Sequence, residues 1–366
     1  IRRAQVEDHP TVPAYQNTLA LIHNDLGSLR SATGDLAGAL QSYESALAIL
    51  KKLTDDHPSV PDYQKDLATG HFSLGSLRST TGDVAGALRS YESALAIRRK
   101  LADEYPSVPD YQKDLAGSHN NLGLLLRDTG DLTGARRSYE SALAIHRSLV
   151  DKHPGVSAYQ DALALSHYNL GELLSATDDF AGARRSYESA LAIQRMLTEE
   201  APPGAIAFQG ALAATHNGLG SLLSNTGDLT GARRSYESAL AIRRKLGDDH
   251  PESPEYASDL GGTLNNLALL DLDAKRFAEA RDRLREAILR QKKALASNPS
   301  NPTYRQFLTN HCTALRLAAQ GLDDADLLAE AESGLAELNA SDPALLALDA
   351  RIAAILKGEV PEGNDE

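Results

Sequence analysis

The sequence predicts an all-α solenoid, a superhelical stack of antiparallel helix pairs. The string Ser-Tyr-Glu-Ser-Ala-Leu-Ala-Ile occurs five times, with spacings of 48, 48, 48 and 49 residues, beginning at Ser42, Ser90, Ser138, Ser186 and Ser235. A second aromatic row has the same period: Tyr15, Tyr63, Tyr111, Tyr159, Phe208, Tyr256 and Tyr304. A fixed period of tens of residues is typical of repeat proteins that grow along one axis.

Residues 107–154 illustrate one repeat. Residues stepping by four, three and four predict one face of a first helix: Leu115, His119, Leu122 and Leu126. Gly130 suits the left-handed position that ends this helix, and Asp131 suits the N-cap of the next. A second helix is marked by Ala135, Tyr139, Ala142 and Leu149, and His153-Pro154 ends it. We therefore expect each repeat to be a hairpin of two helices of about 18–20 residues.

The repeats organise the whole chain. Residues 1–12 read as the second helix of a truncated preceding repeat, because Ile1-Arg2-Arg3 aligns with Ile97-Arg98-Arg99. Five near-identical repeats follow over 13–250, with one inserted residue in the loop within 199–207, where an insertion is tolerated. A divergent sixth repeat spans 251–300 and a degenerate seventh 301–340, and 341–366 reads as a capping helix and acidic tail.

Composition narrows the class of partner. The net charge is −13, and residues 322–366 hold twelve of the 50 acidic residues but only two basic ones. With no basic stripe to neutralise phosphates, we expect no nucleic-acid partner. No apolar run approaches the ~20 residues that span a bilayer, so we expect a soluble protein without membrane insertion, with the cytoplasm favoured. Cys312, the one cysteine, excludes an internal disulfide.

The repeat unit resembles the tetratricopeptide repeat, which implies a right-handed superhelix. The resemblance is carried by Leu122-Gly123, Leu126, Gly130-Asp131, Ala135, Tyr139 and Ala142. It implies that Gly123 and Ala135 let the two helices approach closely and that Tyr139 fills the space between repeats. The period exceeds the family's usual ~34 residues, and His119 stands where the family usually has Trp. The long unit also resembles repeat arrays downstream of serine/threonine-kinase domains in planctomycete bacteria, but no kinase motif is present here.

The resemblance implies a peptide-binding groove lined by the first helices. The candidate groove residues are Asn24, Phe72, Asn120, Asn121, Tyr168, Asn169, Asn217, Asn265 and Asn266. An amide both donates and accepts, so an asparagine row can pair with any extended main chain. The alternative is that these are solvated polar residues between the leucine positions. The family's basic carboxylate clamp is absent, since Asn120 and Leu124 hold its two positions in the third repeat.

Two other rows of residues, one of histidines and one of arginines, are explained by packing and by surface ion pairs. A histidine row comprises His23, His71, His119, His167, His216 and His311. Neighbouring repeats are ~10 Å apart, too far for ligands that share one zinc ion, so we expect half-buried packing and no metal or other cofactor. The arginine pairs beginning at Arg136, Arg184 and Arg233 are expected to pair with nearby carboxylates on an outer, solvated face.

The sequence therefore predicts a non-enzymatic protein-interaction scaffold that binds a partner chain or peptide. Its alternative is a structural protein that self-associates into a fibre or an end-to-end oligomer, because an open stack of near-identical repeats permits head-to-tail contact.

Overall fold

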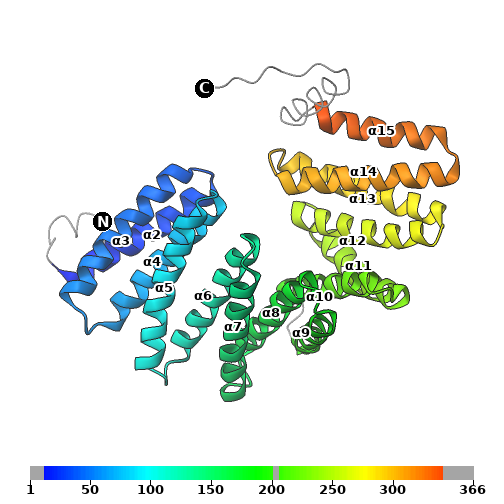
Figure 1. Cartoon of the computed structure of the whole chain (residues 1–366). Coiled ribbons are helices and arrows are strands. Elements are labelled where there is room, and N and C mark those ends of the chain that lie inside the picture. Colours follow the sequence, from blue (N-terminus) through cyan, green and yellow to red (C-terminus); the bar gives the residue numbers. More distant parts are fainter. Residues whose placement is uncertain (1–11, 201–205, 341–366) are drawn as a thin grey trace, which may run out of the picture. The chain divides into compact units, whose positions relative to one another are not determined.

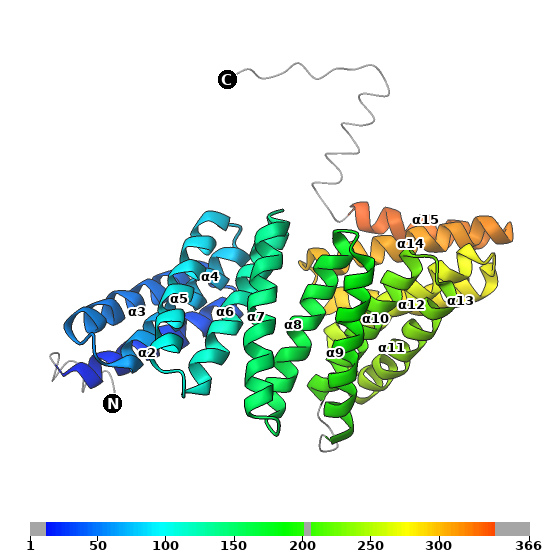
Figure 2. The same cartoon turned by 60° about the horizontal axis from the view of Figure 1, so that its bottom comes forward.

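In a computed structural model, which describes residues 12–200 and 206–340, the chain forms helices joined by short turns (Figures 1 and 2). Every secondary-structure element in those two ranges is an α-helix, which confirms the predicted all-α class. The chain divides into two compact units, Ile1–Glu200 and Ala201–Glu366. The predictions for residues 1–11 and for the capping helix and tail over 341–366 lie outside the structural description.

Unit 1 contains four helical hairpins. Its first helices are α2 (Pro13–Ala32), α4 (Pro61–Thr80), α6 (Pro109–Asp128) and α8 (Ser157–Ala176). Its second helices are α3 (Leu36–Asp56), α5 (Val84–Glu104), α7 (Leu132–Lys152) and α9 (Phe180–Glu200). The helices are 20 or 21 residues long, at or just above the predicted range.

Unit 2 contains three helical hairpins. Its first helices are α10 (Ile206–Asn225), α12 (Pro254–Asp273) and α14 (Pro302–Leu322). Its second helices are α11 (Leu229–Asp249), α13 (Phe277–Ser297) and α15 (Ala325–Ala340). The divergent sixth repeat and the degenerate seventh repeat thus keep the two-helix arrangement although they lack the repeated string.

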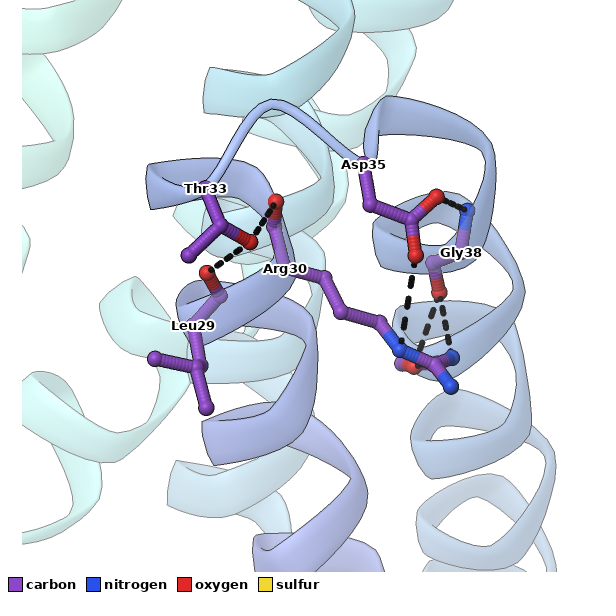
Figure 3. A network of polar contacts seen from close by, with 6 residues as sticks. Leu29, Arg30, Thr33, Asp35 and Gly38 are labelled. Atoms are coloured by element: carbon purple, nitrogen blue, oxygen red, sulfur yellow. Dashed lines mark hydrogen bonds and ion pairs between the residues drawn. The ribbon is translucent and has the colours of Figure 1, made fainter.

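The hairpin turn is built from a glycine and an aspartate. Gly34 adopts φ +84°, a left-handed conformation that glycine enters without a steric penalty. Asp35 then caps α3, because its carboxylate accepts a hydrogen bond of 2.9 Å from the amide of Gly38. In Figure 3 the guanidinium of Arg30 reaches the same turn and donates to the Gly38 carbonyl at 3.1 Å. Thr33 closes the end of α2 by donating to the Leu29 carbonyl at 3.0 Å.

The core of each near-identical repeat is a tyrosine packed on a glycine. Tyr139 is fully buried, and a Cβ atom on Gly123 would lie 2.7 Å from its ring. Ala135 and Ala142 are also fully buried. Only glycine and alanine leave room for the tyrosine between helices this close, so the predicted roles of Gly123 and Ala135 are confirmed. This contact of Tyr139 lies inside its own hairpin, whereas the resemblance implied that the ring fills the space between repeats.

Consecutive hairpins stack through two kinds of contact. Within a unit, each second helix packs on the next first helix, as α3 does on α4 and α11 on α12. First helices also contact one another directly, as α2 with α4 and α6 with α8 in unit 1, and α12 with α14 in unit 2. A residue on a first helix can therefore face its own hairpin, the neighbouring repeat, or open solvent.

Candidate functional site

The open face of the first helices carries exposed leucines at two helix positions. At the ninth or sixteenth residue of a first helix lie Leu21, Leu124 and Leu165 in unit 1, and Leu269 and Leu317 in unit 2. These positions are seven residues apart, so they share one face of the helix. Leu165 exposes 51% of its surface, whereas leucines on the opposite side of α8, such as Leu174, are buried. We call this surface the open face.

The candidate residue at the twelfth position turns away from the open face in the third repeat. Asn120 is 7% exposed, and its amide donates to the hydroxyl of Ser166 on α8 at 3.0 Å. Its equivalent in the second repeat, Phe72, packs on Tyr91 with ring centroids 5.6 Å apart. In the fourth repeat Tyr168 lies 6.0 Å from the ring of Tyr187. These three residues therefore contact the cores and junctions of the stack.

The other twelfth-position residues are also partly or fully covered. Asn24 is half-buried, and Asn265 is buried with 9% of its surface exposed. Asn217 accepts a hydrogen bond of 3.1 Å from Asn266, which ties α12 to α10. The asparagines thus form hydrogen bonds between repeats at several points, whereas the sequence analysis expected them to bind the main chain of a partner.

The thirteenth-position residues lie nearer to the open face. Asn121 is half-buried and donates to the Gly117 carbonyl of its own helix at 3.0 Å. Asn169, one repeat later, is also half-buried. In unit 1 the structure therefore places Asn121 beside Leu124, and Asn169 beside Leu165, as the candidate groove residues nearest to solvent.

Carboxylates add a distinct electrostatic feature to the first helices of unit 1. Burial raises the pKa of Asp161 above the ordinary value for a carboxyl. Burial also raises the pKa of Asp66, against the opposing effect of the hydrogen bond that Asn17 donates to it at 2.9 Å. Glu172 accepts a hydrogen bond from the Tyr187 hydroxyl. This side of the unit thus holds acidic groups beside the exposed leucines.

The histidine row lies in the packing of the stack. His119, His167, His216 and His311 are buried, and His23 and His71 are half-buried, as expected for packing residues. His311 occupies the tenth position of α14 rather than the eleventh, so it belongs to another row. Within residues 12–200 and 206–340, no group of three or more His, Cys, Asp or Glu side chains could hold a metal ion.

The arginine pairs form the expected ion pairs on the second helices. Arg136 contacts Glu140 at 2.9 Å, and Arg184 contacts Glu188 at 2.8 Å, both one helical turn apart. Such exposed pairs contribute little to stability, roughly 0.3–0.5 kcal/mol each. Arg233 departs from this pattern, because it donates to the buried Asp271 of the next repeat at 2.6 Å.

One buried row was missed by the sequence analysis. The residue directly after the repeated string is buried and polar in four of the five repeats, where it is Arg98, His146, Gln194 or Arg243. A variable residue at the end of an otherwise invariant string was the available signal. None of the helices in the described ranges is long and apolar enough to cross a membrane.

Comparison with solved structures supports the fold. The chain is similar to BtubC from P. vanneervenii, with 24% identity over 73% of this chain and 94% of that chain and a TM-score of 0.55. It is similar to the S. pombe nuclear import adaptor Nro1, with 14% identity over 81% of this chain and 99% of that one and a TM-score of 0.51. RapI in its apo form gives 14% identity, coverages of 82% and 99%, and a TM-score of 0.50. At these identities the likeness concerns the fold alone.

Comparison with protein families is more specific. No protein with a curated functional description matches the sequence. The Tetratricopeptide repeat family matches residues 71–105, 114–196 and 211–293, which together make up more than half of the chain. These matches coincide with the hairpins whose tyrosine, glycine and alanine core is described above, and the chain therefore belongs to the tetratricopeptide-repeat family.

Proposed function

We propose that this chain is a non-catalytic scaffold that binds a segment of a partner protein along the open face of α6 and α8. The family membership supports a protein-interaction role. The open face is the best candidate surface because it combines exposed leucines with half-buried asparagines on consecutive first helices that contact each other.

The single observation that carries the proposal is the exposure of Leu124 and Leu165. A folded monomer tolerates scattered exposed leucines, but a row of them on adjacent helices favours an interaction surface. The second helices offer less, because their exposed faces carry ion pairs such as Arg136 with Glu140. The exposed large hydrophobic residues of the second helices in unit 1 are confined to the first residue of each helix, such as Leu132.

The chemistry of the two residue types suggests how a segment would bind. Leu124 and Leu165 would contact apolar side chains, and Asn121 and Asn169 would pair with the main chain, because an amide offers both a donor and an acceptor. An extended chain advances about 3.3 Å per residue, so alternate side chains would face the leucines. Asn120 would not contact the bound segment, because its amide already donates a hydrogen bond to Ser166.

The test uses peptides selected from a random displayed library on the whole chain. Affinity of a selected peptide is measured for the unchanged chain and for Leu124→Ala with Leu165→Ala, and separately for Asn121→Ala with Asn169→Ala. We expect the leucine pair to weaken binding on the order of 100-fold, from ~1–2 kcal/mol per buried leucine. The matched control is Leu132→Ala, a leucine of similar exposure on a second helix, which should leave affinity unchanged.

Two results would contradict the proposal. Loss of affinity in the Leu132 control but not in the leucine pair would move the binding surface to the second helices. Light scattering that shows growing oligomers of the chain alone, reduced by the leucine substitutions, would instead favour self-assembly through the same face.

A further inference from the structure

A pair of buried residues lies at each junction between consecutive repeats within a unit. One member is the fifteenth residue of a second helix, which directly follows the repeated string where the string is present, and the other is the tenth residue of the next first helix. The two members are 20 residues apart in the sequence. The repeated string and the tyrosine–glycine contact recur from repeat to repeat, but the members of this junction pair change along the chain.

The first junction of unit 1 is apolar. Leu50 on α3 is 1% exposed and faces Gly70 on α4. A Cβ atom on Gly70 would lie 3.8 Å from Leu50 and 2.9 Å from Leu47, so the two leucines fill the space that a larger residue would need. No polar group is required on either side of this junction pair.

The second junction is cationic. Arg98 on α5 is 9% exposed, and its guanidinium donates to the Ser118 hydroxyl of α6 at 2.8 Å and to the Asp114 carbonyl at 3.2 Å. The guanidinium also lies 4.8 Å from the centre of the Phe72 ring. Burial lowers the pKa of Arg98, and the nearby Asp114 partly offsets this effect. Leucine in place of Arg98 would leave Ser118 without its donor.

The third junction of unit 1 uses an imidazole. Nδ1 of His146 on α7 lies 2.8 Å from the hydroxyl of Ser166 on α8, and that hydroxyl also receives the amide of Asn120. His146 and Ser166 are 2% and 0% exposed, so water cannot replace these partners. This explains why Asn120 turns away from the open face.

Unit 2 changes the chemistry again. At its first junction Arg243 donates to the Thr263 hydroxyl at 2.5 Å and to the Asp259 carbonyl at 2.9 Å. At its second junction Gln291 and His311 hold the same two positions, and both lie next to Gly261. The described junctions therefore fall into three chemical types: leucine with glycine, a basic or imidazole side chain with a hydroxyl, and amide with imidazole.

Much of the repeat does not distinguish one copy from another. The same string supplies five second helices, and inside the hairpins Tyr43 and Tyr236 pack on Gly27 and Gly220 in the same way. Repeat proteins with near-identical units misassemble by pairing units out of order, within one chain or between two copies. A buried guanidinium or hydroxyl that loses its partner is penalised, so a mismatch at the junction pair disfavours the wrong neighbour.

We propose that the junction pairs specify which repeat docks on which, and that they prevent out-of-order pairing with other repeats of the chain and with a second copy of it. Leu50 on α3 fits against Gly70 on α4. It does not fit against Ser118 on α6, whose hydroxyl would lose its donor. The α5 helix, with Arg98, has the opposite preference, because Gly70 offers its guanidinium no side-chain acceptor.

The first arm of the test is a double-mutant cycle on the whole chain. Arg98→Leu with Ser118→Gly rebuilds at the second junction the leucine–glycine pair of the first. We expect the thermal midpoint of the double variant to exceed the value predicted from adding the two single shifts by about 3 °C or more. The low helix propensity of glycine does not affect the coupling, because Ser118→Gly is present both in its single variant and in the double variant. The control cycle pairs Ser118→Gly with Arg99→Leu, the exposed neighbouring arginine, and should be additive.

The second arm of the test measures whether the repeats still dock in their native order. In the double variant α3 can accept α6 as readily as α4, so refolding at high protein concentration should yield a dimer fraction at least about threefold above that of the unchanged chain, by size exclusion with light scattering. The Arg99→Leu, Ser118→Gly control should refold like the unchanged chain.

An additive Arg98–Ser118 cycle would show that the residues are not a pair. A double variant that refolds to the same monomer fraction as the unchanged chain would show that the pairs do not specify order. Either result overturns the proposal.

Discussion

The buried tyrosines show how one residue can keep its packing role while its polar group changes partner. The Tyr43 hydroxyl lies 3.1 Å from Ser28, and the Tyr236 hydroxyl lies 3.0 Å from Ser221. At the equivalent position of the third repeat stands Leu124, and the Tyr139 hydroxyl has no hydrogen-bond partner among the described residues. Burial raises the pKa of Tyr139 to about 12. The hydroxyl of this tyrosine is therefore paired in the first, fourth and fifth repeats and unpaired in the third.

Removing the hydroxyl should have opposite consequences in these repeats. Tyr139→Phe should leave the free energy of unfolding unchanged or raise it, because no hydrogen bond is lost and an unpaired buried group disappears. Tyr236→Phe should lower it by about 1 kcal/mol, because Ser221 loses its partner. Urea denaturation of both variants measures the difference. Equal losses in the two variants would show that the Tyr139 hydroxyl has a partner after all.

At this scale the sequence predicted what depends on a residue's place within its own repeat. The close approach at Gly123 and Ala135 was predicted correctly from the resemblance, because the contacts inside a hairpin depend on residues within one repeat. The place of Asn120 could not be predicted, because the twelfth position lies at the border between the open face and the neighbouring first helix. Which side it faces depends on how closely α6 and α8 approach each other, and no local pattern records that approach.

At the scale of elements, the turn between α12 and α13 inverts the charges of the turn between α2 and α3. The earlier turn has Arg30 at the end of its first helix and Asp35 as the cap. The later turn has Asp271 at the position of Arg30, and Arg276 replaces the aspartate cap. Asp271 is 1% exposed in its side chain and contacts Arg276 at 2.8 Å, Arg233 at 2.6 Å, and also Arg283. One buried carboxylate thus joins three arginines from two consecutive hairpins.

The Asp271 cluster gives a prediction with a matched control. Asp271→Ala should lower the free energy of unfolding by about 1.5–3 kcal/mol, because it removes the charged hydrogen-bond acceptor that three half-buried arginines share. The control is Asp228→Ala, which removes only the cap of α11 and should cost about 1 kcal/mol. Thermal or urea denaturation at neutral pH distinguishes them. Similar losses of unfolding free energy in the two variants would show that Asp271 contributes no more than an ordinary residue at a helix end.

Elements were predictable to the extent that local signals define them. Gly130 and Asp131 mark the turn, and the helices begin and end where those residues and His153 require. The inverted turn at Asp271 was not predicted, because the sixth repeat lacks the string and one partner, Arg233, lies 38 positions earlier in the preceding repeat. Only their convergence in space identifies them as one cluster.

At the scale of the whole molecule, buried histidines link the stability of both units to pH. Burial lowers the pKa of His146, His167 and His311 to about 4 each, and Arg147 adds to the effect at His167. In an unfolded chain a histidine has a pKa of about 6.5. Between these values the unfolded chain binds protons that the folded chain does not, so stability is full above pH ~6.5 and falls as the pH decreases toward ~4. Asp66 and Asp161, whose pKa values burial raises, act in the opposite direction.

His311 isolates one of these contributions. It is 2% exposed, and neither ring nitrogen has a hydrogen-bond partner among the described residues, so leucine can replace it without breaking a bond. In the unchanged chain the urea midpoint should fall between pH 7.5 and pH 4.5. His311→Leu should reduce this fall by up to the contribution of one proton, ~1.4 kcal/mol per pH unit. Gln291→Leu alters the same site without a titrating group and should keep the full pH dependence. If His311→Leu and Gln291→Leu give the same slope, the His311 ring does not remain neutral in the folded chain.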